Sequence, residues 1–148
     1  MEQEIIHSIT ELFNAADEHD WARMQYQMAD SILVDYSSFT GIPAAELSSA
    51  TITEAWKNFL PGFDKTHHQL SNFSVSQQDG SATATFNGKA DHFIGNESWT
   101  LLATYNASLV KKEDHWVITK LQLNLLEQSG NTGLPAIAAK IVQEKNSA

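Results

Sequence analysis

The segment THHQLSNFSVSQQDGSATATFNGKADHFI, residues 66–94, decides the fold class, because here the hydrophobic period changes from helical to two. Alternate residues of its second half, from Ala82 through Phe86 to Ile94, fall on one face of an extended strand. Asp79-Gly80 is a turn pair that favours a hairpin between two such strands. The segment therefore predicts the start of an antiparallel sheet.

Two further strands continue this sheet. After a second turn at Gly95-Asn96, apolar side chains alternate over residues 99–109, and Glu113-Asp114 turns the chain into Trp116-Val117-Ile118. The apolar parity then slips by one residue. A β-bulge near Thr119-Lys120 explains the slip and would curve the sheet.

The N-terminal half has a helical period instead. Apolar residues recur three or four positions apart, which predicts an amphipathic helix over roughly the first 16 residues. The residues of this stripe are Ile5, Ile9, Leu12, Phe13 and Ala16. We expect a second short helix from His19-Asp20 to Met28 and a short strand over residues 32–36.

A third helix is expected to start at Thr51 or Thr53, either of which can cap it, and to end at Pro61-Gly62. We expect a short final helix over Leu134 to Lys145. Helices followed by an antiparallel meander favour the α+β class over βαβ units. We predict one domain, residues 1–148, in which a conical, curved, mostly antiparallel sheet wraps around N-terminal helices and leaves a cavity.

Composition excludes several kinds of function. The 148 residues, 42% of them hydrophobic, suffice for one core. A net charge of −9 disfavours nucleic acid and anionic membranes as partners. The absence of cysteine excludes disulfides, thiolate zinc sites and cysteine nucleophiles. No stretch resembles a signal peptide or a membrane span of about 20 apolar residues, so we expect a cytoplasmic location.

Two histidines and a tyrosine are the first candidates for chemistry. His92 is in phase with the apolar face of its strand, where an imidazole must be hydrogen-bonded or functional. Either His67 or His68 must face the interior, since neighbours in a strand alternate. Tyr36 ends its short strand. The structural alternatives are a core histidine bonded to a neighbour, solvated strand-edge histidines and a boundary tyrosine.

Asp17 is the fourth candidate. It follows Phe13 by four residues, beside the apolar stripe, at a helix C-terminus where a carboxylate opposes the helix dipole. Some partner should therefore stabilise it. The alternative is that Asp17 or Asp20 caps the second helix.

Three segments carry a family resemblance: ADEHDWARM (residues 16–24), VDYSSF (34–39) and THH (66–68). In order and spacing they resemble the scytalone dehydratase and SnoaL-like branch of the nuclear transport factor 2-like superfamily, over residues 12 to about 118. The resemblance implies a conical α+β fold. It places an active-site Asp on Asp17, a Tyr on Tyr36 and two His on His68 and His92.

The function we predict is that of a cofactor-free lyase or isomerase, dehydratase-like, acting on a small, largely apolar carbonyl or hydroxy compound. Asp17 would orient His68 as general base, while Tyr36 with His92 would donate hydrogen bonds to the substrate oxygen. No metal or other cofactor is expected. The expected substrate-binding residues are Phe39, Trp56, Asn72, Phe86, Trp99, Leu101 and Tyr105.

The sequence also departs from the family pattern. A second active-site Tyr of the family falls on Ala16, and a Ser and an Asn fall on Ala103 and Tyr105. These departures keep open a different function, a non-catalytic small-ligand-binding or assembly protein that uses the same cone. A metal site formed by His67, His68 and His92 is disfavoured, because adjacent strand residues point to opposite faces.

A homodimer is the expected assembly, formed through the open face of the sheet. Five apolar residues cannot all face the interior on one parity, so some should face outward. These residues are Val110, Val117, Leu121, Leu123 and Leu125.

Overall fold

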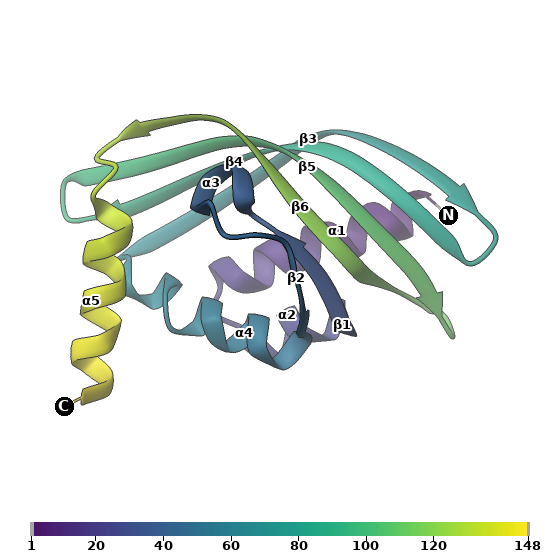
Figure 1. Ribbon diagram of the computed structural model, residues 1–148, viewed down its shortest axis with the longest axis horizontal. Helices are drawn as coiled ribbons and strands as arrows, with labels where there is room; N and C mark the ends of the chain where they lie inside the picture. The colour runs from purple at the N-terminus through teal and green to yellow at the C-terminus, as the bar shows by residue number, and fades with distance from the viewer. Residues whose placement is uncertain (1, 148) are drawn as a thin grey trace.

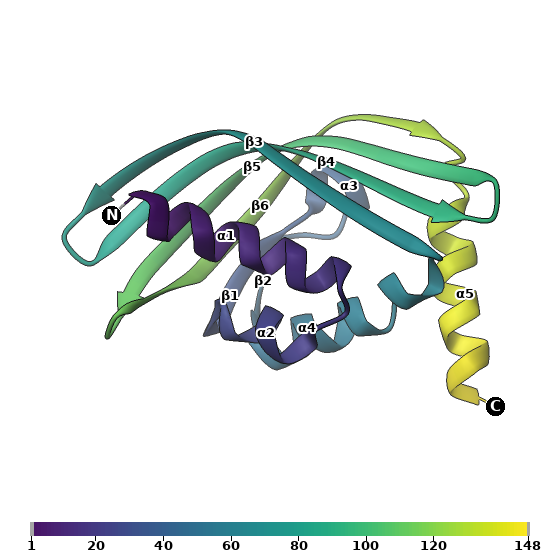
Figure 2. The ribbon, with the colours of Figure 1, turned by 180° about the vertical axis from the view of Figure 1, so that it is seen from behind.

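A curved six-stranded sheet arches over the N-terminal helices in the computed structural model, which describes residues 2–147 (Figures 1 and 2). The strands are β1 (Met28–Asp35), β2 (Ala45–Ser48), β3 (Lys65–Gln78), β4 (Ser81–Ile94), β5 (Glu97–Lys112) and β6 (His115–Gly130). The helices are α1 (Glu2–Asp17), α2 (Trp21–Tyr26), α3 (Ser37–Thr40), α4 (Ser49–Lys57) and α5 (Leu134–Ser147), with the 3-10 turn η1 (Leu60–Gly62).

The strands lie in the order β2-β1-β6-β5-β4-β3, and neighbours are antiparallel except for the parallel pair of β1 and β6. This arrangement confirms the predicted α+β class and the curved, mostly antiparallel sheet.

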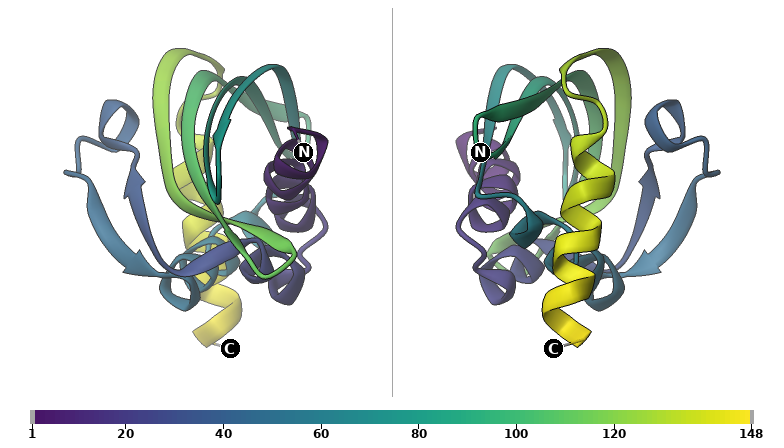
Figure 3. Two further views of the ribbon diagram at one scale, coloured as in Figure 1. Left: turned by 90° about the vertical axis from the view of Figure 1, so that its right-hand side faces the viewer. Right: turned by 90° about the vertical axis from the view of Figure 1, so that its left-hand side faces the viewer.

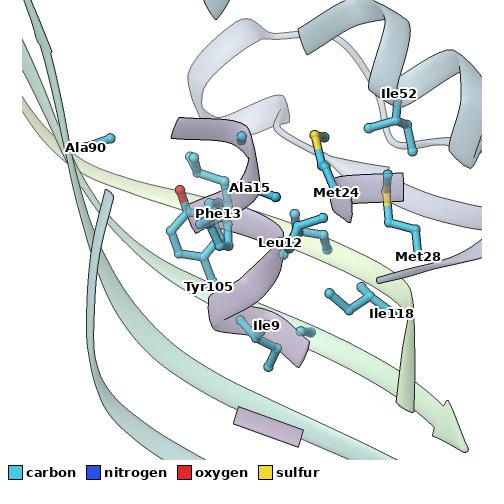
Figure 4. Close-up of a cluster of buried hydrophobic side chains, with 14 of the residues drawn as sticks. Ile9, Leu12, Phe13, Ala15, Met24, Met28, Ile52, Ala90, Tyr105 and Ile118 are labelled. Atoms are coloured by element: carbon cyan, nitrogen blue, oxygen red, sulfur yellow. The ribbon is translucent and has the colours of Figure 1, made fainter. Parts of the chain in front are cut away.

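Helix α1 lies in the concavity of the sheet, where its apolar stripe is buried and removed from water (Figure 2). All five predicted stripe residues are buried. Figure 4 shows Ile9, Leu12 and Phe13 among side chains from the sheet and from the neighbouring helices. Burying a large apolar side chain contributes about 1.5–3 kcal/mol. The stripe therefore fixes α1, and with it the position of Asp17 at its end.

Arg23 and Asp20 set the turn between α1 and α2. The Asp20 carboxylate accepts a hydrogen bond from the Arg23 backbone N–H at 3.2 Å and so caps α2. The Arg23 guanidinium binds Glu11 at 2.7 Å and Glu18 at 2.9 Å. Helix α2 ends at Tyr26, two residues earlier than predicted, because Met28 already pairs with Ile118 of β6.

The segment between β1 and α4 holds two elements that were not predicted, α3 and β2. The β1–β2 hairpin stands away from the body of the sheet (Figure 3), and all of β2 is exposed. The predicted caps of the third helix were wrong: Ser48 is the cap, and its Oγ accepts a hydrogen bond from the Thr51 N–H at 3.1 Å. The helix begins earlier because Ile52 must already be helical to reach the core.

Bulges give the sheet its curvature. Ser108 pairs with Lys120 and Leu109 with Ile118, which leaves Thr119 as the extra residue and confirms the bulge predicted there. A second irregularity in β6 leaves Leu126 unpaired, and a third lies between Ser71 and Ser74 of β3.

The Thr119 bulge also reduces the apolar outer face that the parity argument predicted. Because the Thr119 bulge restores the inward phase, Leu121 and Leu123 are buried like Trp116 and Ile118. Val117 precedes the bulge and is buried as well. Leu125 is half-buried, and Val110 is 38% exposed. The prediction that some of these residues face outward therefore holds for Val110 and fails for Leu121 and Leu123.

Helix α5 packs against η1 at one end of the molecule (Figure 1). Gly62 allows the contact, since a Cβ atom there would lie 2.0 Å from the backbone oxygen of Ala138. Leu134, Ala138 and Val142 form the buried side of α5. This buried side meets η1 at Ala138.

We expect Gly62→Ala to destabilise the protein by about 1–3 kcal/mol, the usual cost of overpacking, because the backbone atoms it would meet cannot give way. Gly80→Ala is the matched control, since a Cβ at Gly80 meets nothing within 4 Å. Urea unfolding of both variants measures the difference. Equal stabilities would contradict the tight packing of η1 against α5.

Candidate active site

Asp17 and His68 form a hydrogen-bonded pair where the end of α1 meets the start of β3. The His68 Nδ1 lies 2.6 Å from the Asp17 Oδ1. The His68 backbone N–H donates to Oδ2 at 2.7 Å, and the Thr66 hydroxyl donates to Oδ1 at 2.9 Å. Thr66 and His68 can both reach the carboxylate because residues two apart in a strand face the same side.

The three donors keep Asp17 ionised. Burial raises the pKa of the Asp17 carboxyl, but the hydrogen bonds and charge of His68 and the hydrogen bond from Thr66 outweigh it, so the pKa lies below its usual value. An ionised carboxylate only accepts hydrogen bonds, so Nδ1 of His68 carries a proton. The other ring nitrogen, Nε2, is then the atom that His68 can offer as a base.

Aromatic side chains of the core pack next to the His68 ring. Its ring centroid lies 5.1 Å from that of Phe13 and 6.2 Å from that of His92. The His68 side chain is 10% exposed and that of Asp17 is 13% exposed. The pair is therefore largely shielded from water while His68 borders a cavity.

His92 is held by the strand beside it. Its Nδ1 lies 3.0 Å from the carbonyl oxygen of Trp99, and its ring stacks on the Trp99 indole at 4.2 Å. Burial lowers the pKa of His92 to about 4, with a smaller contribution from the charge of His68; the hydrogen bond to Trp99 acts in the opposite direction. His92 is therefore neutral at pH 7.

A carbonyl oxygen cannot donate, so the His92 proton is on Nδ1 and Nε2 is an acceptor. The sequence suggested His92 as a hydrogen-bond donor to the substrate oxygen. At neutral pH the ring does not fit that role. It fits a group that accepts a hydrogen bond from a ligand hydroxyl.

Tyr36 and Tyr105 place two phenols in the same space. Tyr36 follows the last residue of β1, and Tyr105 comes from the middle of β5. Burial raises the pKa of both phenols, that of Tyr36 well above its ordinary value. Both are therefore neutral hydroxyl donors at physiological pH.

These groups border a cavity of about 180 Å³. A 150 Å³ apolar cavity in another protein holds benzene, so this one suits a single ring with small substituents. Its lining residues are Tyr36, Phe39, Thr40, Trp56, Phe59, Leu60, His68, Ala90, His92, Trp99, Leu101, Tyr105 and Leu123. Eight of these were named from the sequence as catalytic or substrate-binding candidates.

Two predicted substrate-binding residues lie elsewhere. Asn72 is exposed, because the β3 irregularity, in which its φ is +56°, breaks the alternation that placed it beside His68. Phe86 is buried behind Tyr105, with ring centroids 5.0 Å apart, and does not line the cavity. Phe73 packs on Phe86 from the other side.

Five lining residues were not predicted. Phe59 and Leu60 belong to the apolar pattern of the third predicted helix, which could have suggested them. Leu123 could be placed only once the Thr119 bulge was recognised. Thr40 lies on α3, which had no sequence signal, and Ala90 shares the parity of His92.

The other hollows lack comparable chemistry. A hollow of about 760 Å³ lies between α2, the start of β1 and the β5–β6 turn, and neither Asp17 nor His68 lines it. Within residues 2–147, no cluster of His, Cys, Asp or Glu could hold a metal ion. His67 is exposed on the opposite side of β3 from His68. The described helices include none with the length and apolar character of a membrane span.

Comparison with known proteins identifies the family of this chain. The SnoaL-like domain family matches residues 1–122, and the chain belongs to that family. No curated protein matches the chain by sequence.

Solved structures share the fold at low identity. A Kribbella flavida protein, Kfla4162, is 20% identical, with a TM-score of 0.82 and 96% of each chain covered. A scytalone dehydratase candidate from Novosphingobium aromaticivorans is 15% identical, with a TM-score of 0.76 over 88% of this chain and 87% of that chain. Hexachlorocyclohexane dehydrochlorinase LinA-type3 from Novosphingobium barchaimii is 13% identical, with a TM-score of 0.71 over 89% and 90% of the two chains.

His92 should make stability depend on pH. Its pKa is about 4 when folded and about 6.5 when unfolded, so the unfolded state takes up the proton first as the pH falls. The contribution is complete above about pH 6.5 and is lost toward pH 4. We expect it to lower the free energy of unfolding by about 2 kcal/mol at pH 5 relative to pH 7.

His92→Gln isolates this contribution, because the amide can still donate to the Trp99 carbonyl but does not titrate. Urea unfolding of both proteins at pH 7 and pH 5 is the measurement. The variant should show a pH dependence smaller by that amount. The same pH dependence in both proteins would show that His92 is not buried in its neutral form.

Proposed function

We propose that the protein is a cofactor-free lyase that removes a proton next to a carbonyl group and eliminates a small leaving group, as a dehydratase does. The observation that carries this proposal is the Asp17–His68 pair at the wall of a small apolar cavity. A base oriented by a carboxylate at the wall of an apolar cavity is suited to proton transfer.

The proposed reaction needs one base and one hydroxyl donor. Nε2 of His68 takes the proton from the carbon next to the carbonyl, and the C–H electron pair moves toward the carbonyl oxygen. Tyr36 donates a hydrogen bond to that oxygen as its negative charge grows. The electrons then return to form a C=C bond, the C–O bond to the β-hydroxyl breaks, and protonated His68 gives its proton to that hydroxyl. The products are an unsaturated carbonyl compound and water.

Asp17 contributes through charge and position. Its carboxylate accepts a hydrogen bond from Nδ1–H of His68, which leaves Nε2 as the free base and stabilises the imidazolium formed during transfer. The apolar walls exclude water and so strengthen the hydrogen bond to the developing oxyanion. No residue in this scheme needs a cofactor.

The names of two structural neighbours are compatible with this chemistry. A dehydratase eliminates water and a dehydrochlorinase eliminates hydrogen chloride, and both reactions begin at a C–H bond. At 13–15% identity these proteins share the fold, so they support the reaction class without fixing the substrate.

A second candidate is a small-ligand-binding or assembly protein without turnover. The observation in its favour is that Ala16 and Ala103, where the family resemblance implied polar groups, are both buried apolar positions. A homodimer through the sheet face and a cytoplasmic location remain predictions for either function. Light scattering at micromolar concentration tests the dimer, and a 16.4 kDa particle would contradict it.

Proton abstraction can be tested without knowing the leaving group. In D2O the protein should exchange the α-hydrogens of small cyclic ketones, followed by NMR. We expect His68→Ala to lower the exchange rate by about 10²–10⁴-fold and Asp17→Asn to lower it strongly. His67→Ala is the matched control and should leave the rate unchanged, because His67 is exposed on the other face of β3.

The outcome separates the two candidates. Exchange that depends on His68 and not on His67 supports the lyase. Ketone binding seen by ligand NMR, with no exchange above the solvent rate, would contradict the lyase and favour the binding protein.

A further inference from the structure

Helix α3 carries part of the cavity wall but has little of its own to hold it in place. Tyr36, Phe39 and Thr40 line the cavity, and all three lie on α3 or directly before it. The helix is four residues long, and none of them is buried. An isolated helix shorter than about 12 residues is marginal in water. Contacts with the rest of the fold must therefore fix these side chains.

Local hydrogen bonds give this segment a defined shape. The Asp35 carboxylate accepts from the N–H of Ser37 at 3.0 Å and from its hydroxyl at 2.6 Å. The Tyr36 carbonyl accepts from the Thr40 hydroxyl at 3.1 Å, and Gly41, with a φ of +76°, ends the helix. Each of these bonds joins residues close together in sequence. They shape the turn without attaching it to β6.

Ser38 attaches the turn to the sheet. Its hydroxyl donates to the backbone carbonyl of Leu123 at 2.8 Å and accepts from the backbone N–H of Leu125 at 2.9 Å. Both partners belong to β6 and lie 85 and 87 positions further along the chain. Ser38 itself does not line the cavity. Its contribution is therefore to the position of the segment.

The two bonds continue the ladder between β1 and β6. The parallel pairing of these strands ends at Asp35, which lies opposite Gln122. In a parallel ladder, one residue bonds to a carbonyl and an N–H that lie two residues apart on the neighbouring strand. The carbonyl of Leu123 and the N–H of Leu125 have this spacing. A single hydroxyl can serve both, because it donates and accepts.

Residues on both sides of Ser38 depend on this attachment. The Tyr36 carbonyl accepts from the N–H of Phe39 at 2.9 Å and from the N–H of Thr40 at 2.8 Å, so the backbone around Ser38 moves as one turn. The Phe39 ring stacks on Trp99 with centroids 5.8 Å apart. Displacing the turn would therefore displace the Tyr36 phenol and one aromatic wall together.

We propose that Ser38 is a positioning residue of the candidate active site, whose hydroxyl attaches α3 to β6 and thereby sets the position of Tyr36 and Phe39 at the cavity. This inference rests on the proposed function for its part in the reaction. The attachment itself is a property of the free protein and can be tested without turnover.

The first test measures the attachment by amide hydrogen exchange. Ser38→Ala removes the partner of the Leu125 N–H, which should exchange with D2O about tenfold faster or more. The Ile118 N–H donates to the Gln27 carbonyl at 2.9 Å on the same edge of β6 and should keep its rate. Ser37→Ala is the matched control, because the Ser37 hydroxyl does not bond to β6. Unchanged exchange of the Leu125 amide in Ser38→Ala would overturn the attachment.

The second test reports on the Tyr36 ring. The chain has three tyrosines, so labelling their ring Cζ atoms with ¹³C gives three signals, which Tyr→Phe variants assign. Ser38→Ala should shift the Tyr36 signal and leave that of Tyr26, which is 64% exposed, unchanged. Ser38→Thr should restore the Tyr36 signal, because it keeps the hydroxyl and the exposed position has room for a methyl group. A Tyr36 signal that does not change in Ser38→Ala would overturn the positioning role.

The third test shows whether Ser38 acts through Tyr36. Ser38→Ala should lower the rate of deuterium exchange into cyclohexanone about tenfold or more, since small misplacements of a catalytic group are costly. In a Tyr36→Phe background the same substitution should change the rate less than about twofold, because effects that share one group are not additive. A general loss of stability would lower the rate by the same factor in both backgrounds. That result would overturn the proposal.

The outcomes separate this inference from the proposed function. Absent deuterium exchange in the unmodified protein, with a Tyr36 signal and a Leu125 amide that both respond to Ser38→Ala, would refute the lyase and leave Ser38 as the residue that positions Tyr36. Exchange that depends on His68 but is indifferent to Ser38→Ala would refute the positioning role alone.

Discussion

The carboxylate of Asp17 is the group on which the site depends. It sits at the last residue of α1, where the helix dipole disfavours a negative charge by about 0.3–1 kcal/mol, and it is largely buried. Three donors from the start of β3 compensate it, and a hydrogen bond to a charged group contributes about 1.5–3 kcal/mol. The balance favours the ionised, bound carboxylate and ties the end of α1 to the edge strand of the sheet.

The other features of the cavity follow from this attachment. With Nδ1 of His68 bound to Asp17, its Nε2 is the nitrogen available to a ligand. His92, held by Trp99, adds a second acceptor and no charge at neutral pH. Tyr36 and Tyr105 supply neutral donors. An apolar cavity with a base and with hydroxyl donors is suited to moving one proton and holding one oxyanion.

Much of this could be predicted from the sequence, because the relevant signals are periodic or local. The change of period near Thr66 indicated the fold class, and the parity slip after Ile118 located one bulge. Asp17, Tyr36, His68 and His92 were singled out by residue type and position together with the family resemblance. The structure places Tyr36, His68 and His92 at the wall of one cavity, with Asp17 hydrogen-bonded to His68.

What could not be predicted depends on irregular backbone and on contacts between strands. Asn72 was assigned to the wrong face because strict alternation does not continue through the irregularity between Ser71 and Ser74 of β3. Leu123 faces inward only because of the Thr119 bulge. The lean of Tyr105 over Gly88 needs the register of β4 against β5, which no single segment encodes.

The protonation of the His68 ring tests the central claim most directly. In protein labelled with ¹⁵N-histidine at pH 7, a two-bond ¹H–¹⁵N spectrum distinguishes the two ring nitrogens. The account predicts that Nδ1 of His68 carries a proton, held in its hydrogen bond to Asp17 and slow to exchange with water. An unprotonated Nδ1 in His68, with the proton on Nε2, would contradict it, because that ring could neither donate to Asp17 nor act as a base toward the cavity.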